Sequence, residues 1–201
     1  FNTSSLYYDG NTREYVFKKS DIKYVDEGLL NVIKYQGRPR CKTIPLTYDA
    51  GDFLELCGWY ISEGYVQEYL GDGGISGTSR KVVICQDGDS PLFDRIMLLL
   101  NRMGITYHIA NGRKIVITSD LLYRFMKDMF GSGARNKKID KWVYNFSSVC
   151  IKRMFESMVL GDGCIRGGYE YYTSSKRLVD DIKLLVRFIG MYVTNVRNRR
   201  N

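Results

Sequence analysis

Two nine-residue segments of the chain share one pattern, and this repeat constrains the fold more than any other feature. The first reads Leu56-Cys-Gly-Trp-Tyr-Ile-Ser-Glu-Gly64, and the second reads Phe155-Glu-Ser-Met-Val-Leu-Gly-Asp-Gly163. Each is a mainly apolar run with a small residue in third place, a carboxylate in eighth place and then a glycine. The pattern predicts two helices whose carboxylates lie at corresponding ends, 99 residues apart in sequence (162 minus 63).

The small and acidic positions of the repeat predict a close helix pair with a metal at one end. Gly58 and Ser157 are equivalent, and small side chains there allow two helix backbones to approach closely. Burial of two amphipathic helices explains the apolar positions but not Glu63 and Asp162. A carboxylate at a helix C-terminus opposes the helix dipole, and two neighbouring carboxylates repel each other. Because a divalent cation removes both penalties, we predict that these two acids bind a metal.

The charge of the chain indicates a polyanionic partner. Its 201 residues carry a formal charge of +8, with a pI near 9.2, which favours nucleic acid over an anionic membrane surface. The sequence lacks an apolar run of about 18 residues, a signal-peptide pattern and a phosphate-binding P-loop motif. We therefore expect a soluble, intracellular protein without membrane contact and without an NTP-driven motor.

Cysteine and histidine usage excludes further kinds of site. The five cysteines have no C-x-x-C spacing and one histidine accompanies them, which argues against structural zinc and a disulfide framework. We expect the cysteines to be core residues in a reducing compartment. His108 lies in an alternating stretch typical of a strand, so we do not expect a histidine-dependent catalytic site.

Composition divides the chain into four segments. These are a β-rich N-terminal segment over residues 1–50, a first repeat over 51–134, a lysine-containing linker over 135–150 and a second repeat over 151–201. In the first repeat, Asp52 is expected to cap a helix over residues 53–63 that ends at a left-handed Gly64. The further expected elements are strands at 65–70 and 80–86, a helix from Pro91 to Gly104, strands at 105–110 and 114–118, and a helix at 120–130.

The second repeat follows the same order and ends sooner. After the helix that ends at Asp162 we expect strands at 164–166 and 169–173 and a helix at 176–189. About one strand's length of sequence remains after residue 191, so the second repeat is incomplete relative to the first. The predicted class is α+β, with two related halves.

The two motifs and the strand-strand-helix order after each of them resemble the LAGLIDADG homing endonucleases in their two-motif, single-chain form. The resemblance covers about residues 53–200. It implies two pseudo-symmetric αββαββα halves, joined at the motif helices, that lay an antiparallel β saddle onto double-stranded DNA with a long recognition site. It also implies a monomer with an internal pseudo-two-fold axis. The consensus acid of the motif is aspartate, so Glu63 is a departure that retains the carboxylate.

The resemblance also implies the catalytic groups. Glu63 and Asp162 would bind Mg²⁺, for which Mn²⁺ can substitute, and would activate water. The segment from Arg135 to Val143 is similar to the lysine-containing block between the family's motifs, with Asp140 in place of a proline. Lys137 then matches the catalytic lysine, which can stabilise negative charge that develops on the phosphate.

Basic and aromatic residues on the expected strands predict the DNA contacts. Such side chains can enter a major groove, where lysines and arginines bind phosphates and base edges. Tyr65 and Tyr69 interleave with polar neighbours on one of these strands. The expected contact residues are Arg80, Lys81, Arg113, Lys114, Lys138, Arg166, Tyr169, Tyr171, Arg197, Arg199 and Arg200.

The N-terminal segment lies outside the resemblance, and two alternative functions for the chain stay open. Residues 15–23 resemble a segment of intein splicing domains, which often carry LAGLIDADG enzymes, but Phe1 is not a splicing nucleophile and we do not predict splicing. The segment over residues 1–50 is interpreted either as an intein-like remnant or as an extension that contacts DNA. The principal alternative function is a DNA- or RNA-binding module, either a regulator or an RNA-splicing maturase, that does not cleave. A nuclease with a D-x-K signature is a minor alternative, because Asp181-Ile-Lys183 fits that signature and so does Asp21-Ile-Lys23.

Overall fold

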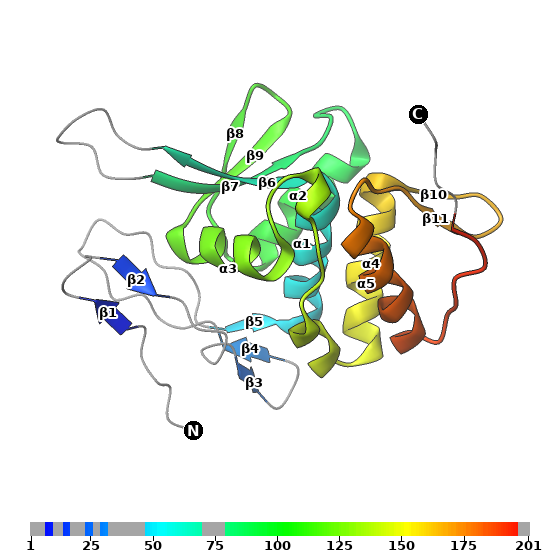
Figure 1. Cartoon of the computed structure of the whole chain (residues 1–201). Coiled ribbons are helices and arrows are strands. Elements are labelled where there is room, and N and C mark those ends of the chain that lie inside the picture. The colour runs from blue at the N-terminus through cyan, green and yellow to red at the C-terminus, as the bar shows by residue number, and fades with distance from the viewer. Residues whose placement is uncertain are drawn as a thin grey trace.

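The computed structural model (Figure 1) describes residues 7–9, 14–16, 23–25, 29–31, 47–69 and 79–196. Three of the expected DNA contacts, Arg197, Arg199 and Arg200, lie outside this part of the chain. The architecture is mixed α and β with an antiparallel four-stranded sheet, which confirms the predicted α+β class.

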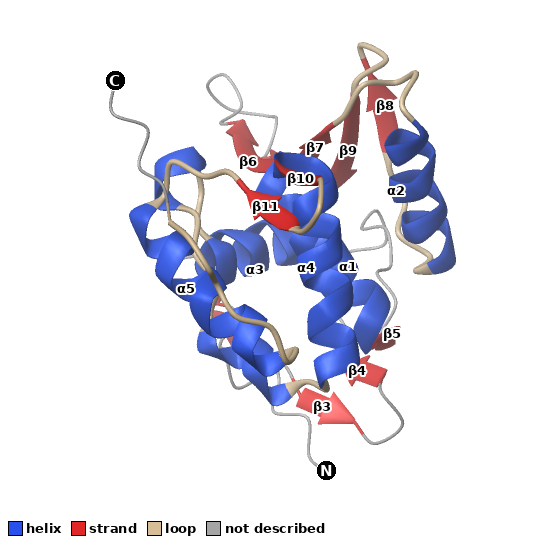
Figure 2. Ribbon diagram, turned by 90° about the vertical axis from the view of Figure 1, so that its right-hand side faces the viewer, coloured by secondary structure: helices blue, strands red, loops and turns tan. Residues whose placement is uncertain are grey.

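Two motif helices, α1 (Ala50–Glu63) and α4 (Ser148–Asp162), form the centre of the molecule and make its most extensive contact between elements. They lie side by side in both views (Figures 1 and 2). Nearly all of α1 is buried because α4 covers one side while α2, α3 and the four-stranded sheet pack against it elsewhere. The motif helices therefore build the core as well as the join between the halves.

The ends of α1 differ from the predicted ones. Asp49 rather than Asp52 is the N-cap: its Oδ1 accepts a hydrogen bond of 2.9 Å from the Asp52 amide, so the helix begins three residues earlier than expected. Gly64 is extended, with φ −102° and ψ 154°, and is not left-handed. The expectation at Gly64 was wrong because the chain passes directly from the helix into a strand, where a left-handed turn would break the pairing.

The first repeat carries the larger sheet. Strands β6 (Gly64–Tyr69), β7 (Ser79–Cys85), β8 (His108–Ala110) and β9 (Lys114–Thr118) pair in the antiparallel order β6-β7-β9-β8. Helix α2 (Pro91–Arg102) begins behind the Ser90 cap, and α3 (Asp120–Phe130) begins behind Ser119. Asn111, with φ 55°, and Gly112, with φ 64°, form the turn between β8 and β9, as is typical of an Asn-Gly pair.

The second repeat is smaller over the described residues. Strands β10 (Gly163–Ile165) and β11 (Tyr169–Tyr171) form a two-stranded antiparallel sheet, and α5 (Lys176–Phe188) packs against α4. Both this sheet and the four-stranded sheet lie toward the end of the α1–α4 pair where the motif helices finish (Figures 1 and 2).

The linker contains two short 3₁₀ helices, η2 (Ala134–Asn136) and η3 (Lys141–Asn145). Asp140, where the resembling family has proline, caps η3 by accepting a 3.0 Å hydrogen bond from the Trp142 amide. The Trp142 ring packs edge-on against Phe125 and Phe146, with centroids 5.4 and 4.7 Å away. The linker is thereby anchored to the core of the first repeat.

The N-terminal segment consists of short strands in its described parts: β1 (Tyr7–Asp9), β2 (Glu14–Val16), β3 (Lys23–Val25), β4 (Leu29–Asn31) and β5 (Thr47–Asp49). Strand β5 pairs with β4 and leads directly into α1. Throughout the described chain, each helix is too short or too polar to cross a lipid bilayer.

Candidate functional site

The C-terminal ends of α1 and α4 touch, and this contact brings the two motif acids to one place. A Cβ added to Gly161 would overlap the Ser62 hydroxyl and would lie 3.0 Å from the Glu63 Cγ. Farther along the pair, a Cβ on Gly58 would overlap the Ser157 hydroxyl and the main-chain oxygen of Met154. The structure therefore places Gly58 against Ser157, the pair of small residues expected between the motif helices. A second close approach, at Gly161, was not predicted from the sequence.

The two carboxylates occupy an environment that disfavours their charge. Partial burial, followed by the negative charge of Asp162, raises the pKa of the Glu63 carboxyl. Desolvation also raises the pKa of Asp162, although this residue lies at the molecular surface, and the Lys137 ammonium acts in the opposite direction. Two acids that both resist ionisation at a surface-accessible helix end form a suitable site for a cation.

The donor set fits a hard divalent cation. Mg²⁺ binds oxygen ligands and is commonly held by one or two carboxylates together with substrate phosphates and water. Glu63 and Asp162 supply two such carboxylates at one helix junction. Within the described part of the chain, three or more His, Cys, Asp or Glu side chains do not gather into a metal-binding group.

Lys137 lies deep beneath this site. Its side chain is 5% exposed, and its ammonium donates hydrogen bonds to the main-chain oxygens of Tyr60, at 2.6 Å, and of Gly64, at 2.8 Å. Burial lowers the pKa of Lys137 to about 7, while the nearby Asp162 carboxylate acts to raise it. The amine therefore caps the end of α1 and also lies within electrostatic reach of an acid of the site.

Tyr60 is a supporting residue that the sequence reading missed. Its ring lies under Lys137, with the amine 3.5 Å from the ring centroid, and its hydroxyl donates a 2.6 Å hydrogen bond to the Gly131 main-chain oxygen. On the other side, the Ser175 hydroxyl donates a 2.6 Å hydrogen bond to the Lys137 main-chain oxygen. The lysine is thus fixed by both repeats. A tyrosine inside an apolar helical run was the available signal.

The four-stranded sheet separates its expected DNA contacts onto two faces. Arg80 lies on the helix side, because its guanidinium binds Asp120 of α3 at 2.7 Å and Glu68 at 2.8 Å. Lys81 is the next residue on β7, so its side chain lies on the opposite face. There the Lys81 ammonium stands 4.9 Å from the Tyr69 ring centroid. Lys114 shares this face, because it pairs with Cys85, four residues along the strand from Lys81.

The other expected contacts are distributed around the same end. Arg113 is exposed in the β8–β9 turn, and its guanidinium is 3.8 Å from Asp87. Arg166 is exposed in the β10–β11 turn, and Lys138 is half-buried beside Lys137. Tyr169 is 42% exposed on β11, with its ring centroid 5.4 Å from that of Phe155. The Tyr171 hydroxyl is buried and has no hydrogen-bond partner among the described residues.

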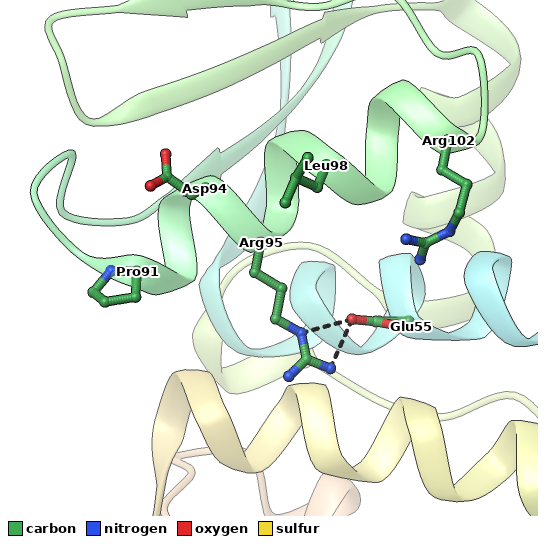
Figure 3. Close-up of a pocket in the computed structure, with 6 residues that line it drawn as sticks. All are labelled: Glu55, Pro91, Asp94, Arg95, Leu98 and Arg102. Atoms are coloured by element: carbon green, nitrogen blue, oxygen red, sulfur yellow. Dashed lines mark hydrogen bonds and ion pairs between the residues drawn. The ribbon is translucent and has the colours of Figure 1, made fainter.

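A second charged cluster, which the sequence reading did not find, lies toward the N-terminal half of α1. Asp52 and Glu55 are 6% and 4% exposed, yet both are ionic partners of arginines. Arg95 of α2 binds Glu55 at 2.9 Å beside a shallow pocket of about 420 Å³ (Figure 3). Arg102 of α2 donates two hydrogen bonds to Asp52, at 2.6 and 2.9 Å. Arg153 of α4 contacts both acids, 2.8 Å from Glu55 and closer still to Asp52.

The arginines of this cluster dominate its electrostatics. Burial raises the pKa of Asp52, but hydrogen bonds from Arg102 and Arg153 outweigh it, and the net pKa of Asp52 is lowered. The arginines therefore stabilise the charged form of Asp52, whereas the pKa values of Glu63 and Asp162 are raised. The three-residue spacing of Asp49, Asp52 and Glu55 was the available sequence signal.

Comparison with known proteins gives low sequence identity over nearly the whole chain. Protein-family models do not match it. It is 24% identical over 197 residues to a DNA polymerase of Thermococcus sp. (strain GE8) and 23% identical over 171 residues to an uncharacterized protein of Methanocaldococcus jannaschii. It is also 23% identical over 207 residues to an ATP-dependent Clp protease proteolytic subunit of Chlamydomonas moewusii. These alignments cover 94%, 78% and 94% of the chain but only 11%, 19% and 20% of the relatives. The chain thus spans about a tenth to a fifth of the length of these relatives.

Comparison with solved structures identifies the fold. The complex of I-DmoI with DNA and Mn matches with a TM-score of 0.53 at 14% identity, covering 75% of this chain and 84% of that one. A set of mesophilic variants of the homing endonuclease I-DmoI matches with a TM-score of 0.55 at 14% identity, covering 75% and 83%. The chain has the fold of this homing endonuclease, which confirms the predicted resemblance at the level of architecture.

Proposed function

We propose that this chain, which has the fold of the homing endonuclease I-DmoI, is an endonuclease that hydrolyses double-stranded DNA at a long, specific site. The observation that carries the proposal is the junction of α1 and α4. There, the acids at the eighth position of the two motifs, a glutamate and an aspartate, meet at the helix ends beside the two sheets. Structural packing accounts for the glycines of this junction but gives no reason for two acids that disfavour each other's charge.

In this proposal, Glu63 and Asp162 hold a divalent cation, Mg²⁺ or Mn²⁺. Bound there, the cation would supply Lewis-acid stabilisation of the phosphate and a water of lowered pKa. The solved structures of I-DmoI that match the fold include complexes with DNA in the presence of Mn or Mg, and they support this assignment. Lys137 contributes a positive charge within electrostatic reach of Asp162 and fixes the end of α1 on which Glu63 stands.

DNA would lie against the sheets at this end of the molecule. The positive charge of the chain supports binding to phosphates, and the open face of the four-stranded sheet carries Lys81 and Lys114. Arg113, Arg166 and Tyr169 are exposed at the same end and complete the proposed contact surface. Arg80 is assigned a structural role, because both sides of its guanidinium bind carboxylates of the helix face. We further propose that the protein acts as a monomer, since the two halves already supply both acids.

The relatives suggest how such a segment is carried. Sequences similar to this chain make up about a tenth to a fifth of proteins as different as a DNA polymerase and a protease subunit. A segment that recurs within unrelated hosts is what an inserted, mobile element would produce. We infer that this chain derives from such an insertion, in keeping with the intein-like resemblance of its N-terminal segment.

The deciding experiment is cleavage of a randomised library of DNA duplexes with Mg²⁺ or Mn²⁺. It compares the unaltered protein with Glu63→Gln and Asp162→Asn. We expect specific cutting that both substitutions abolish, while Glu156→Gln, on the exposed side of the same helix α4, leaves it unchanged. Cutting by the two acid variants at the rate of the unaltered protein would contradict the assignment of the site.

The alternative, a DNA- or RNA-binding module that does not cleave, is favoured by one observation. The Lys137 amine already donates to two main-chain oxygens and is largely enclosed, so it is less available to a phosphate than a catalytic lysine on the surface would be. Tight binding of DNA or structured RNA in Ca²⁺, without product in Mg²⁺ or Mn²⁺, would decide for this alternative.

A further inference from the structure

The positive charge of the chain is distributed unevenly between the two repeats. Residues 135–201 contain 14 lysines and arginines and 6 aspartates and glutamates, a formal charge of +8 (14 minus 6). Residues 51–134, which include the four-stranded sheet, contain 8 and 10, a formal charge of −2 (8 minus 10). The linker and the second repeat therefore carry a charge as large as that of the whole chain, although their described sheet is the smaller one.

Part of this charge is gathered where the linker runs along the start of α5. The Ser175 hydroxyl donates a 2.6 Å hydrogen bond to the Lys137 main-chain oxygen, and the Ile139 amide donates one of 2.8 Å to the Asp181 carboxylate. Helix η2 also contacts α5. These contacts bring four basic residues from two segments close together, and we call them the linker patch: Arg135, Lys138, Lys176 and Arg177.

The described protein neutralises little of the charge of the linker patch. Three of its four residues are exposed, and the fourth is half-buried. Two acids of α5 lie nearby, but both have partners of their own. The Asp181 carboxylate accepts the linker amide and is 3.9 Å from the Arg177 guanidinium, while Asp180 is ion-paired within α5. Within the described chain, Arg135 and Lys176 make no ion pair.

The basic residues of the first repeat are in a different situation. Ion pairs with carboxylates hold Arg80, Arg95, Arg102, Arg113 and Arg124. Helices α1, α2 and α3 each carry an acid in the first turn, where the helix dipole favours negative charge. Helix α5 instead begins with two basic residues, which the dipole disfavours. Neither ion pairing nor helix stability therefore explains the charge of the linker patch.

The linker patch adjoins the proposed metal site through Lys137. Arg135 and Lys138 stand close to this lysine in sequence, and its amine donates to the main-chain oxygen of Gly64, the residue after Glu63. Helix α5 follows β11 after a short loop and begins at the end of α4 where the sheets lie (Figures 1 and 2). The linker patch is thus at the same end of the molecule as the proposed DNA contacts.

We propose that the linker patch is a further DNA-binding surface, which binds backbone phosphates of the target duplex outside the two sheets. This inference rests on the proposed binding of DNA at this end of the molecule. Lysine and arginine side chains bind phosphates without regard to base sequence. The linker patch therefore supplies affinity on the side of the smaller sheet, while the four-stranded sheet supplies more of the base contacts.

The test measures how DNA affinity depends on salt when the linker patch is neutralised. The patch variant combines Arg135→Ala, Lys176→Ala and Arg177→Ala. The matched control removes the same charge from more distant positions of the second repeat, by combining Lys152→Ala, Lys183→Ala and Arg187→Ala. Fluorescence anisotropy in Ca²⁺ is recorded at several salt concentrations, on a duplex selected by cleavage and on a random duplex of the same length.

For the patch variant we expect the slope of log affinity against log salt to fall by about 2.7 on both duplexes, because each phosphate contact contributes about 0.9. Between 50 and 200 mM salt, its affinity should therefore drop roughly 40-fold less than that of the unaltered protein. The control should keep the original slope. Single-turnover cleavage at saturating DNA should keep its rate, and the melting temperature should not fall, because the three side chains are exposed.

The possible failures are distinguishable. A patch variant with the slope of the control would overturn the inference and leave the proposed cleavage intact, provided that Asp162→Asn is inactive. A slope reduced on the selected duplex alone, or cleavage slowed at saturating DNA, would also overturn it, because the residues would then contact bases or the reacting phosphate. DNA binding with the expected slopes but without product in Mg²⁺ or Mn²⁺ would support the linker patch and remove the endonuclease. Absence of DNA binding by the unaltered protein would remove both.

Discussion

At the scale of single residues, Lys137 has two functions in one position. Its amine donates to the main-chain oxygens of Tyr60, in the last turn of α1, and of Gly64, the first residue of β6, and it also counters the charge of Asp162. The resemblance identified this lysine from its place before the second motif. It did not indicate burial, because a lysine pair in a linker is most often solvated. Only the packing of the linker against both repeats encloses the side chain.

The pKa of about 7 for Lys137 predicts a stability that depends on pH. Between pH 7 and the ordinary lysine value of 10.5, the unfolded chain binds this proton and the folded chain does not. Raising the pH across this window therefore favours the folded state, by up to about 1.4 kcal/mol per pH unit. Denaturant unfolding measured from pH 7 to 9 should show this slope, and Lys137→Met should remove it. Equal slopes in the two proteins would mean that Lys137 stays charged in the fold.

At the scale of elements, the contact between α1 and α4 depends on the absence of side chains. Gly58→Ala would gain up to about 1 kcal/mol in helix propensity. The new Cβ would overlap the main-chain oxygen of Met154, which cannot rotate away, so the helices must separate. We expect a net loss of about 1–3 kcal/mol in the free energy of unfolding, with reduced cleavage, measured by denaturant titration and plasmid assay.

Gly168→Ala is the matched control for this change. A Cβ at Gly168 would meet nothing within 4 Å, and the residue lies in the turn beyond β10. Its stability should equal that of the unaltered protein. A Gly58→Ala variant as stable as the Gly168→Ala variant would show that the helices do not approach as closely as described.

If DNA binds the open face of the four-stranded sheet, its affinity should depend on salt concentration through the lysines of that face. Replacing Lys81 or Lys114 with alanine should weaken DNA binding evenly across sequences and reduce the slope of log affinity against log salt by about one per lysine. Fluorescence anisotropy in Ca²⁺ at several salt concentrations measures this slope. Lys183→Ala on α5, where the lysine binds Asp180 at 2.7 Å, should leave it unchanged. An unchanged slope in the Lys81 and Lys114 variants would place DNA elsewhere.

Local patterns predicted most elements well and the junctions between them less well. The expected bounds of β9 and α3 match the observed ones, because a strong turn pair precedes one and a serine cap precedes the other. The start of α1 was misplaced because Asp49 and Asp52 are both good caps, and only tertiary packing distinguishes them. Asp52 instead turns inward and binds Arg102 and Arg153, which lie more than 40 residues away in sequence. A local sequence pattern cannot predict contacts between residues so far apart in the chain.

At the scale of the whole molecule, Arg153 joins the two halves by charge. It contacts Asp52 and Glu55 of the other motif helix, and both acids are almost fully buried. Arg153→Ala would leave Asp52 to Arg102 alone and Glu55 to Arg95 alone. We expect a loss of about 3 kcal/mol in the free energy of unfolding, the low end for a broken buried pair, because the Arg153 side chain is 33% exposed.

The control for this loss is Arg113→Ala, since Arg113 and Asp87 form a loose and exposed pair. Its denaturant midpoint should not move measurably. If Arg153→Ala unfolds at the same denaturant concentration as Arg113→Ala, solvent has replaced the arginine without cost and the cluster does not hold the halves together.

The unequal sheets have a consequence for the information content of the DNA target. With strands spaced about 4.8 Å apart, four strands present a surface about twice as wide as two strands do. Base pairs stack every ~3.4 Å along the duplex, so the four-stranded sheet of the first repeat can meet about twice as many of them as the described sheet of the second. The protein should therefore tolerate base changes unequally on the two flanks of the DNA target. In the proposed complex, base changes on the flank that meets the four-stranded sheet should reduce DNA affinity more than changes on the flank that meets the described strands β10 and β11.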